Sequence, residues 1–592
     1  MRRRLALACL GWLLVAGAHA QQADPRETAA LNALFERQWE DISRRYPEGS
    51  TYRGDLRYND RLSDASFEAD EAAFAQGRQW LAQARAIRRE QLAPTDRISL
   101  DLFIGARERE LEDHAFTGYR SLGLGALGGI QSEFADLMQF VPVRTPLQAQ
   151  QVLSRMAAYP RVMDQQIAWL RRGVSLGWVS SQAVLERVVK QIDVLLPADV
   201  EAGPYFAPFR KLPQDIPQQQ RTSLQAEGRA AIEKNVVPAM RKLRAFIVDE
   251  YLPRAPRSGA MSSYPDGAKV YEMLVRHRTT TKLSAAEIHA IGVRELDAIR
   301  AEMETVMRAT GFKGSFDEFI RYLNTDRKFF HTDEAALLAG YRDIAKRIDA
   351  ELPRLFAELP RAPYGVRAMP AFRGPDAAEY YDGPAQDGSR GGYFVANTVG
   401  FRSRPTWRMA TLTAHEAVPG HHLQVARATE LRSLPPFRRD DGYVAFIEGW
   451  AVYAETLGRE IGLYDGDPYS LFGHLQWRAF RAARLVVDTG IHSMGWSSQR
   501  AVEFMVDRTG MDRAFVESEV DRYVSTPGQA LGYMIGALKI RELRERGRAR
   551  LGDAFDVRRF HNAVIDQGAL PLDVLEKVID EWIAAEEKKA KP

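Results

Sequence analysis

The amino-acid sequence predicts a mainly α-helical protein of two lobes around a deep cleft. Long stretches repeat their apolar residues at the helical period and are rich in strong helix formers such as Ala, Leu, Arg and Glu. A chain of 592 residues can bury more than one core, and its length is typical of two to four lobes. Charged residues at 27% and aromatic residues at 10% are ordinary for a globular protein. We therefore expect helical lobes with a small β element.

Helical patterns alternate with Gly/Pro-rich breaks along the chain. The predicted helical stretches are residues 26–45, 66–114, 146–195, 218–253, 284–309, 315–325 and 333–358. The candidate boundaries between lobes are the breaks at residues 201–217, 253–267 and 360–392. Ser284 and Glu287 have the spacing of a capping box. We expect an N-terminal helical lobe at residues 21–260 and a second helical lobe at residues 261–592, interleaved around one cleft.

The first 20 residues predict an export signal. Met1–Arg4 is positively charged, Leu5–Gly17 is a short apolar core, and Ala18-His19-Ala20 is a cleavage site of the A-x-A type. No later stretch of the sequence is long and apolar enough to span a membrane. We expect a periplasmic or secreted protein that is cleaved near Ala20, with no membrane span.

The cysteine content and the net charge exclude some kinds of site and partner. The only cysteine, Cys9, lies within the predicted signal, which excludes disulfides and zinc–thiolate sites from the mature chain. Ala6 stands three residues before Cys9, where a lipoprotein signal has leucine, so lipid attachment is not expected. The net charge is +3 and there is no long basic run, so neither a nucleic acid nor an anionic membrane is indicated as a partner.

The segment T-A-H-E-A-V-P-G-H-H-L-Q at residues 413–424 resembles the H-E-x-x-H helix of zinc hydrolases, with two extra residues. His415 and His421 are six residues apart, which on a regular helix turns their side chains about 120° from each other. His422 lies on the same face as His415 but roughly 10 Å further along the axis. Neither pair can bind one ion unless Pro419-Gly420 distorts the helix. The alternative is an ordinary helix end with unremarkable histidines.

A third ligand is available on the next apolar helix, residues 443–455. Glu448 and Glu455 are seven residues apart and project from the same helix face. A carboxylate on a buried face is costly unless it is paired or bound to a metal. We expect Glu448 as a ligand and Glu455 as a partner of a ligating histidine; the alternative is a pair of solvated or salt-bridged acids.

These motifs, H-E-x-x-P-G-H-H-x-Q followed by E-G-W-A-x-Y-x-E, resemble the bacterial family called domain of unknown function 885. The resemblance extends to residues 283–292, 384–398, 484–497 and 527–536. That family is similar to helical gluzincin metallopeptidases such as the thermostable carboxypeptidases, oligopeptidases and angiotensin-converting enzyme. The resemblance implies a metallopeptidase-like fold that binds one zinc ion.

Ligands and catalytic groups follow from the resemblance. It implies His415, His421 and Glu448 as zinc ligands and Glu416 as the general base, while His422 would be a supporting or substrate-facing residue. In the similar peptidases a downstream histidine and tyrosine donate to the oxyanion, which points to His492 and Tyr533. The alternative for each is an ordinary core residue.

Three further expectations concern substrate binding. Arg481 and Arg484 are candidates for holding a substrate carboxylate, although either could instead form a salt bridge. Residues 391–398 read as a short strand beside the metal helix, and in similar enzymes such a strand pairs with the substrate backbone. Tyr393 and Asn397 on this strand would then contact substrate; the alternative is a structural hairpin.

Together these features predict an exported zinc-dependent hydrolase of short peptides, carboxypeptidase- or dipeptidase-like. Glu416 would take a proton from the activated water and pass it to the leaving amine. One alternative is a non-catalytic binding protein of the bacterial envelope built on a hydrolase scaffold. Another is a metal-dependent hydrolase of a non-peptide amide or ester.

Overall fold

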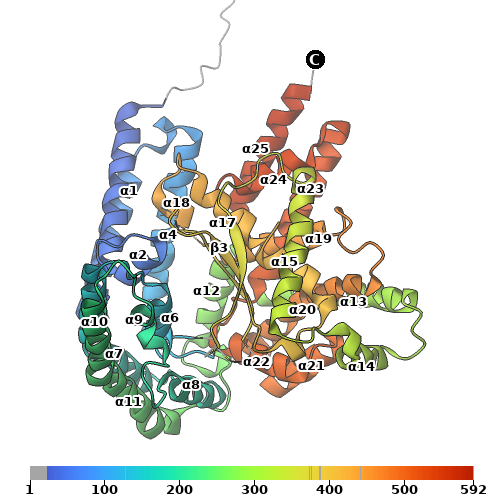
Figure 1. The fold of residues 1–592 in the computed structure, drawn as a ribbon. Helices are drawn as coiled ribbons and strands as arrows, with labels where there is room; N and C mark the ends of the chain where they lie inside the picture. Colours follow the sequence, from blue (N-terminus) through green and yellow to red (C-terminus); the bar gives the residue numbers. More distant parts are fainter. Residues whose placement is uncertain are drawn as a thin grey trace, which may run out of the picture.

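The computed structural model describes residues 23–590 apart from residues 127, 372–373, 375–376, 386–387 and 441. The predicted signal, residues 1–20, lies outside the described residues. The fold is mainly helical, as predicted, with one small sheet. Figure 1 shows the blue-to-green helices of the N-terminal part on one side of the view and most of the yellow-to-red helices on the other, with β3 (Gly392–Ala396) between them.

The N-terminal part is built from helices of very different length. They are α1 (Pro25–Arg45), α2 (Pro47–Arg53), α3 (Phe67–Ala86), α4 (Pro94–His114), α5 (Thr117–Arg120), α6 (Glu133–Phe140), α7 (Pro146–Ser175), α8 (Gln182–Leu195), α9 (Ala207–Arg210), α10 (Gln218–Ala231) and α11 (Val237–Phe246). The predicted stretch 66–114 is two helices because Pro94 starts a new one. Likewise 146–195 divides near Gly177, whose φ is +75°.

The C-terminal part carries most of the fully buried helices. They are α12 (Gly267–Thr279), α13 (Ala285–Ala309), α14 (Phe316–Thr325), α15 (Glu334–Glu351), α16 (Thr406–Glu416), α17 (His421–Glu430), α18 (Pro436–Asp440), α19 (Val444–Leu457), α20 (Pro468–Ser493), α21 (Ser498–Thr509), α22 (Arg513–Ser525), α23 (Leu531–Leu551), α24 (Val557–Ile565) and α25 (Leu572–Ala590). The predicted capping box of Ser284 and Glu287 is present at the start of α13.

The sheet has three strands, β1 (Tyr364–Ala368), β2 (Tyr380–Asp382) and β3 (Gly392–Ala396), in the order β1-β3-β2. β3 pairs parallel with β1 and antiparallel with β2. The predicted strand is therefore present, but it is the central strand. Both edges of its backbone are already paired, so the expectation that residues 391–398 add a substrate strand at an edge is corrected.

One large apolar core joins the two predicted lobes. It contains buried residues from Leu62 to Ile583, and a smaller cluster around Phe35 and Phe103 packs α1, α3 and α4 together. The boundary near residue 260 stays a prediction. No described helix is both long and apolar enough to cross a membrane.

α19 and α23 pack unusually closely, and this contact positions the site. A Cβ atom on Gly536 would lie 1.7 Å from the Ala445 carbonyl oxygen, and one on Gly449 would lie 2.5 Å from the Cα atom of Gly536. Only glycine at both positions lets the two backbones approach this far. The contact brings Tyr533 on α23 toward the helix that carries Glu448.

Candidate metal centre

His415 and His421 lie on either side of a break between two helices. α16 ends at Glu416, α17 begins at His421, and Ala417–Gly420 connects them. The two imidazole centroids are 4.8 Å apart. The expected distortion is present, as a complete break between helices rather than a bulge within one.

The conformation of the Ala417–Gly420 connection depends on Gly420 and on a contact with α19. A Cβ atom on Gly420 would lie 2.0 Å from the carbonyl oxygen of His415, so no larger residue fits without moving the backbone. The Trp450 indole N–H donates a 3.0 Å hydrogen bond to the Pro419 carbonyl. Because Trp450 is on α19, the break is tied to the helix that supplies Glu448.

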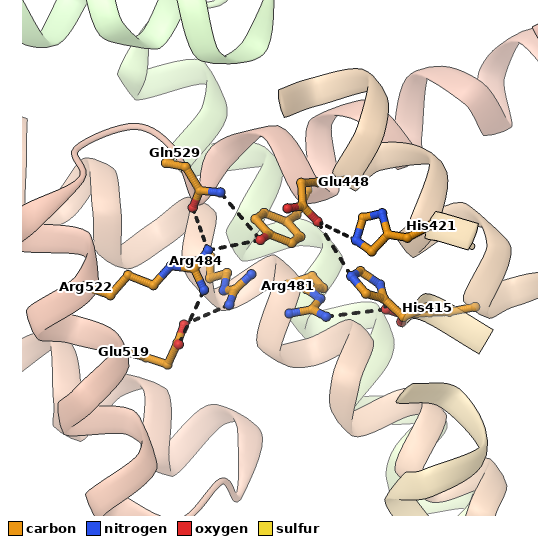
Figure 2. A network of polar contacts seen from close by, with 10 residues as sticks. His415, His421, Glu448, Arg481, Arg484, Glu519, Arg522 and Gln529 are labelled. Atoms are coloured by element: carbon orange, nitrogen blue, oxygen red, sulfur yellow. Dashed lines mark hydrogen bonds and ion pairs between the residues drawn. The ribbon is translucent and has the colours of Figure 1, made fainter. Parts of the chain in front are cut away.

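The side chains of His415, His421 and Glu448 converge. The Nε2 atoms of His415 and His421 lie 3.6 and 3.4 Å from Oε2 of Glu448 (Figure 2). One nitrogen or oxygen atom from each of the three residues lies within 4.8 Å of the others. Glu448 Oε2 is buried and, within the described part of the chain, accepts no hydrogen bond.

These distances fit a zinc ion. Tetrahedral bonds of about 2.0–2.1 Å place neighbouring ligand atoms roughly 3.4 Å apart. Two imidazoles and one carboxylate with a fourth position open is a ligand set of catalytic zinc sites. Burial raises the pKa of the Glu448 carboxyl, but the facing imidazoles of His415 and His421 outweigh it and hold the pKa well below its ordinary value. The carboxylate is thus ionised, as a metal ligand must be.

Glu455 contacts the Nδ1 atom of the His415 ring, whereas Nε2 faces Glu448. The Oε1 atom of Glu455 lies 2.8 Å from Nδ1 of His415, and both side chains are buried. This contact places the proton on Nδ1 and leaves Nε2 free to face Glu448. Arg481 approaches the same Oε1 atom at 3.6 Å.

Glu416 lines the same cavity without a partner. Glu416 is 6% exposed, and within the described residues no hydrogen bond or ion pair holds its carboxylate. Burial raises its pKa to about 8, and the negative charge of Glu448 adds to this effect. A buried, unpaired carboxyl beside the triad is well suited to exchange protons with a bound molecule.

The cavity has a volume of about 480 Å³ and a mixed lining. Apolar side chains from five helices form part of its wall: Leu412, Val425, Ile447, Trp477, Phe480 and Phe515. Tyr380 and Tyr381 of the edge strand β2 also line it. Two clusters of charged side chains line the rest of the cavity. One is the triad of His415, His421 and Glu448 together with Glu416, and the other is a set of arginines around Tyr533.

The arginines surround the Tyr533 ring. The Arg484 and Arg481 guanidinium carbons lie 4.4 and 5.0 Å from its centroid, and the His415 ring stacks at 6.3 Å, 8° from parallel. Arg522 donates a 3.0 Å hydrogen bond to the Tyr533 hydroxyl oxygen. Within the described residues no group accepts the hydroxyl proton of Tyr533.

His492 is not brought to this cavity. Its Nδ1 atom accepts a hydrogen bond from the backbone N–H of Met261, and its Nε2 atom lies 3.0 Å from the Tyr523 carbonyl. Both ring nitrogens are therefore engaged by backbone, and burial lowers the pKa of His492 to about 4. The histidine stays neutral in the core, and the structure gives it no position from which to donate to an oxyanion beside Glu448.

Three other predicted residues have their contacts outside the cavity lining. His422 Nδ1 lies 2.9 Å from the Tyr381 hydroxyl, on the sheet side of α17. Tyr393 packs its ring under Arg367. Asn397 donates to the carbonyls of residues 374 and 377 and accepts from the Gly400 N–H. None of the three lines the cavity, and Asn397 instead fixes the segment that leads into β2.

Sequence reasoning missed Glu519 and Arg522 on α22. Phe515, Glu519 and Arg522 are four and three residues apart, the spacing of one helix face, and all three line the cavity. This spacing was visible in the sequence, but nothing in it showed that the face meets α20. Glu379 was also missed; it lines the cavity while ion-paired with Arg404 at 2.8 Å.

Comparison with known proteins identifies relatives along nearly the whole length. The family described as bacterial protein of unknown function (DUF885) matches residues 47–579. A solved structure from Colwellia psychrerythraea covers 94% of this chain and 99% of its own at 27% identity, with a TM-score of 0.88. Another from Shewanella oneidensis covers 93% and 99% at 17% identity with a TM-score of 0.69, which shows a shared fold. Both are described as putative lipoproteins. No curated protein matches the sequence.

Proposed function

We propose that this chain, which belongs to the DUF885 family, is an exported zinc-dependent hydrolase that cleaves peptide bonds in short peptides. The observation that carries the proposal is the convergence of His415, His421 and Glu448 beside an unpaired Glu416. Export is supported by the signal pattern at residues 1–20 and by structural relatives described as lipoproteins.

His415, His421 and Glu448 would hold the ion through Nε2, Nε2 and Oε2. A zinc ion bound there would act as a Lewis acid toward a carbonyl group and lower the pKa of a water molecule. Glu455 would keep His415 in the tautomer and orientation that the ligand role requires.

Glu416 would act as the proton carrier. It would accept a proton from the attacking water and deliver it to the nitrogen of the leaving amine. Burial raises its pKa to about 8, and a positive charge beside it would favour the ionised form that accepts protons. Tyr533, whose hydroxyl oxygen is engaged by Arg522, would donate its proton toward the developing oxyanion.

A cavity of about 480 Å³ fits a short peptide rather than a folded protein. Its apolar walls would pack against side chains, while the charged clusters would contact the backbone and the reacting bond. Short peptides or small amide conjugates of the bacterial envelope are therefore the expected substrates.

The test is digestion of a library of short peptides by the zinc-loaded mature chain, with products identified by mass spectrometry. Wild type should cleave peptides, and Glu416→Gln should bind zinc equally but lose at least about 100-fold in rate. Glu503→Gln, at an exposed position on α21, is the matched control and should cleave like wild type.

Two outcomes would contradict the proposal. If wild type carries zinc, cleaves nothing and binds peptides as tightly as Glu416→Gln, the protein is a binding protein. If wild type hydrolyses only non-peptide esters or amides in a parallel screen, the metal chemistry stands and the peptide assignment fails.

A further inference from the structure

Arg481 and Arg484 present buried hydrogen-bond donors that no described residue satisfies. Arg481 Nε and Arg484 Nη1 are buried without a hydrogen-bond partner, and both side chains line the cavity. Arg481 and Arg484 are 5% and 2% exposed. A buried donor without a partner is costly, so such a pair indicates a place that a ligand fills.

The charged groups around Arg481 and Arg484 favour the binding of an anion. Arg484 donates to Glu519 at 2.8 Å, and Arg522 approaches the same carboxylate at 3.5 Å. Arg481 is paired with Glu455 at 3.6 Å, and this carboxylate is already bonded to His415. The Glu416 carboxyl of the same cavity also interacts with Arg481 through its charge. Arg484 and Arg522 thus share the carboxylate of Glu519, whereas Arg481 makes no hydrogen bond to an acid among the described residues. Its guanidinium charge is therefore available to attract an anion.

The three arginines are not equivalent. Arg522 already donates to Gln529 at 2.8 Å and to the Tyr533 hydroxyl at 3.0 Å, so it positions Tyr533. Arg481 has no hydrogen bond within the described residues, and Figure 2 shows it between the Glu519–Arg522 side of the cavity and the His415–His421 side. Arg481, with Nη1 of Arg484, is therefore the group best placed to receive a ligand.

The distance between the two arginines and the metal centre limits how many residues of a bound peptide can lie between them. Arg481 Nη2 lies 3.6 Å from Oε1 of Glu455, and the same oxygen lies 2.8 Å from Nδ1 of His415, so Arg481 Nη2 and His415 Nδ1 are no further apart than these two distances together. An extended peptide spans about 3.3–3.6 Å per residue. A carboxylate held by the arginines would therefore lie one or two residues beyond a bond placed at His415 and Glu448.

We propose that Arg481 and Arg484 bind the free C-terminal carboxylate of the substrate, so that the enzyme removes one or two residues from the C-terminal end of short peptides. This inference rests on the proposed hydrolysis at the metal centre and names its substrate class. A planar guanidinium donates two parallel bonds to a carboxylate and has no such partner in a neutral carboxamide.

The test compares an N-acetylated tripeptide with its C-terminal primary amide on the zinc-loaded mature chain. The free acid should have a kcat/KM at least about 100-fold higher than the amide, because charge-assisted hydrogen bonds are lost with the charge. Arg481→Gln should narrow this ratio to within about 5-fold, and Arg481→Lys should retain an intermediate preference. Arg478→Gln, at a half-buried arginine of the same helix that pairs with Glu302, is the matched control and should keep the full ratio.

A binding measurement separates this inference from the hydrolysis it rests on. Calorimetry with Glu416→Gln should show tighter binding of the acid than of the amide by a similar factor. If wild type cleaves acid and amide equally, the carboxylate inference is overturned and hydrolysis stands. If neither is cleaved but the acid still binds more tightly and Arg481→Gln removes that preference, the carboxylate site stands and the proposed hydrolysis is overturned. Equal binding of acid and amide overturns the carboxylate site whether or not cleavage occurs.

Discussion

At the scale of single residues, the partners of a side chain decide its role more than its type does. His415 and His492 are both buried histidines. One has Nδ1 held by a carboxylate and Nε2 facing a second carboxylate, whereas the other has both nitrogens engaged by backbone. Only the first arrangement leaves a lone pair directed at a shared ligand position.

The contact between Glu455 and His415 makes a direct prediction. Glu455→Gln removes the charge that orients His415, so zinc affinity should fall about 10–100-fold. The measurement is the zinc dissociation constant in competition with a chelator of known affinity. Glu586→Gln, a substitution at a buried glutamate on α25 that pairs with Arg559, should leave the affinity unchanged; equal affinities for all three proteins would contradict the role of Glu455.

Residue-level prediction from the sequence succeeded where the partners are close along the chain. His415, Glu416 and His421 are near neighbours, and Glu448 and Glu455 share one helix face, so their grouping could be anticipated. The surroundings of His492 could not be, because Met261 is 231 residues away and no local pattern specifies which backbone group meets a ring nitrogen.

At the scale of elements, glycines place the helices that carry the site. The Ala417–Gly420 break lets α16 and α17 offer His415 and His421 to one point. The Gly449–Gly536 contact lets α23 approach α19. Pro419-Gly420 predicted the first from the sequence. The second depends on which helices pack together, and this was not encoded in any local pattern.

Gly536→Ala tests the helix contact. The added methyl group would lie 1.7 Å from the Ala445 carbonyl oxygen, so α19 and α23 must separate, and stability should fall by at least about 1–3 kcal/mol. Gly77→Ala is the matched control, since a Cβ on this helical glycine of α3 meets nothing within 4 Å; it should stabilise by about 0.5–1 kcal/mol. Thermal unfolding measures both, and equal shifts for the two variants would contradict the packing argument.

The strands show the limit of prediction at this scale. A strand at residues 391–398 was predicted, and β3 occupies most of it. Its central position in the sheet was not predictable, because β1 and β2 come from the Gly/Pro-rich stretch 360–392 and pair through long-range register. This register, rather than the strand itself, excludes substrate pairing along β3.

At the scale of the whole molecule, one core unites the N- and C-terminal helices, and His492 and His561 are buried. Burial lowers the pKa of His492 and of His561 to about 4, compared with about 6.5 in an unfolded chain. Between these values the unfolded chain binds protons that the folded chain does not. Their contribution to stability is therefore fully present above about pH 6.5 and is lost as the pH falls toward 4.

This linkage predicts a measurable pH dependence. The free energy of unfolding of wild type should fall as the pH is lowered from 7 to 5, by up to about 1.4 kcal/mol per pH unit for each such histidine. The unfolding temperature should fall with it. His492→Gln should show a shallower decline over the same range, whatever its stability at pH 7. Calorimetry at several pH values makes the comparison, and parallel curves for the two proteins would contradict the assignment of His492 as a neutral core residue.

The most direct test of the metal centre is the metal content of the purified mature chain, measured by mass spectrometry of the elements after exposure to zinc and removal of excess. Wild type should carry close to one zinc ion per chain, and Glu448→Gln should carry much less, because the carboxylate that faces both imidazoles has lost its charge. A wild-type chain that holds no metal and takes up none would contradict the account of His415, His421 and Glu448.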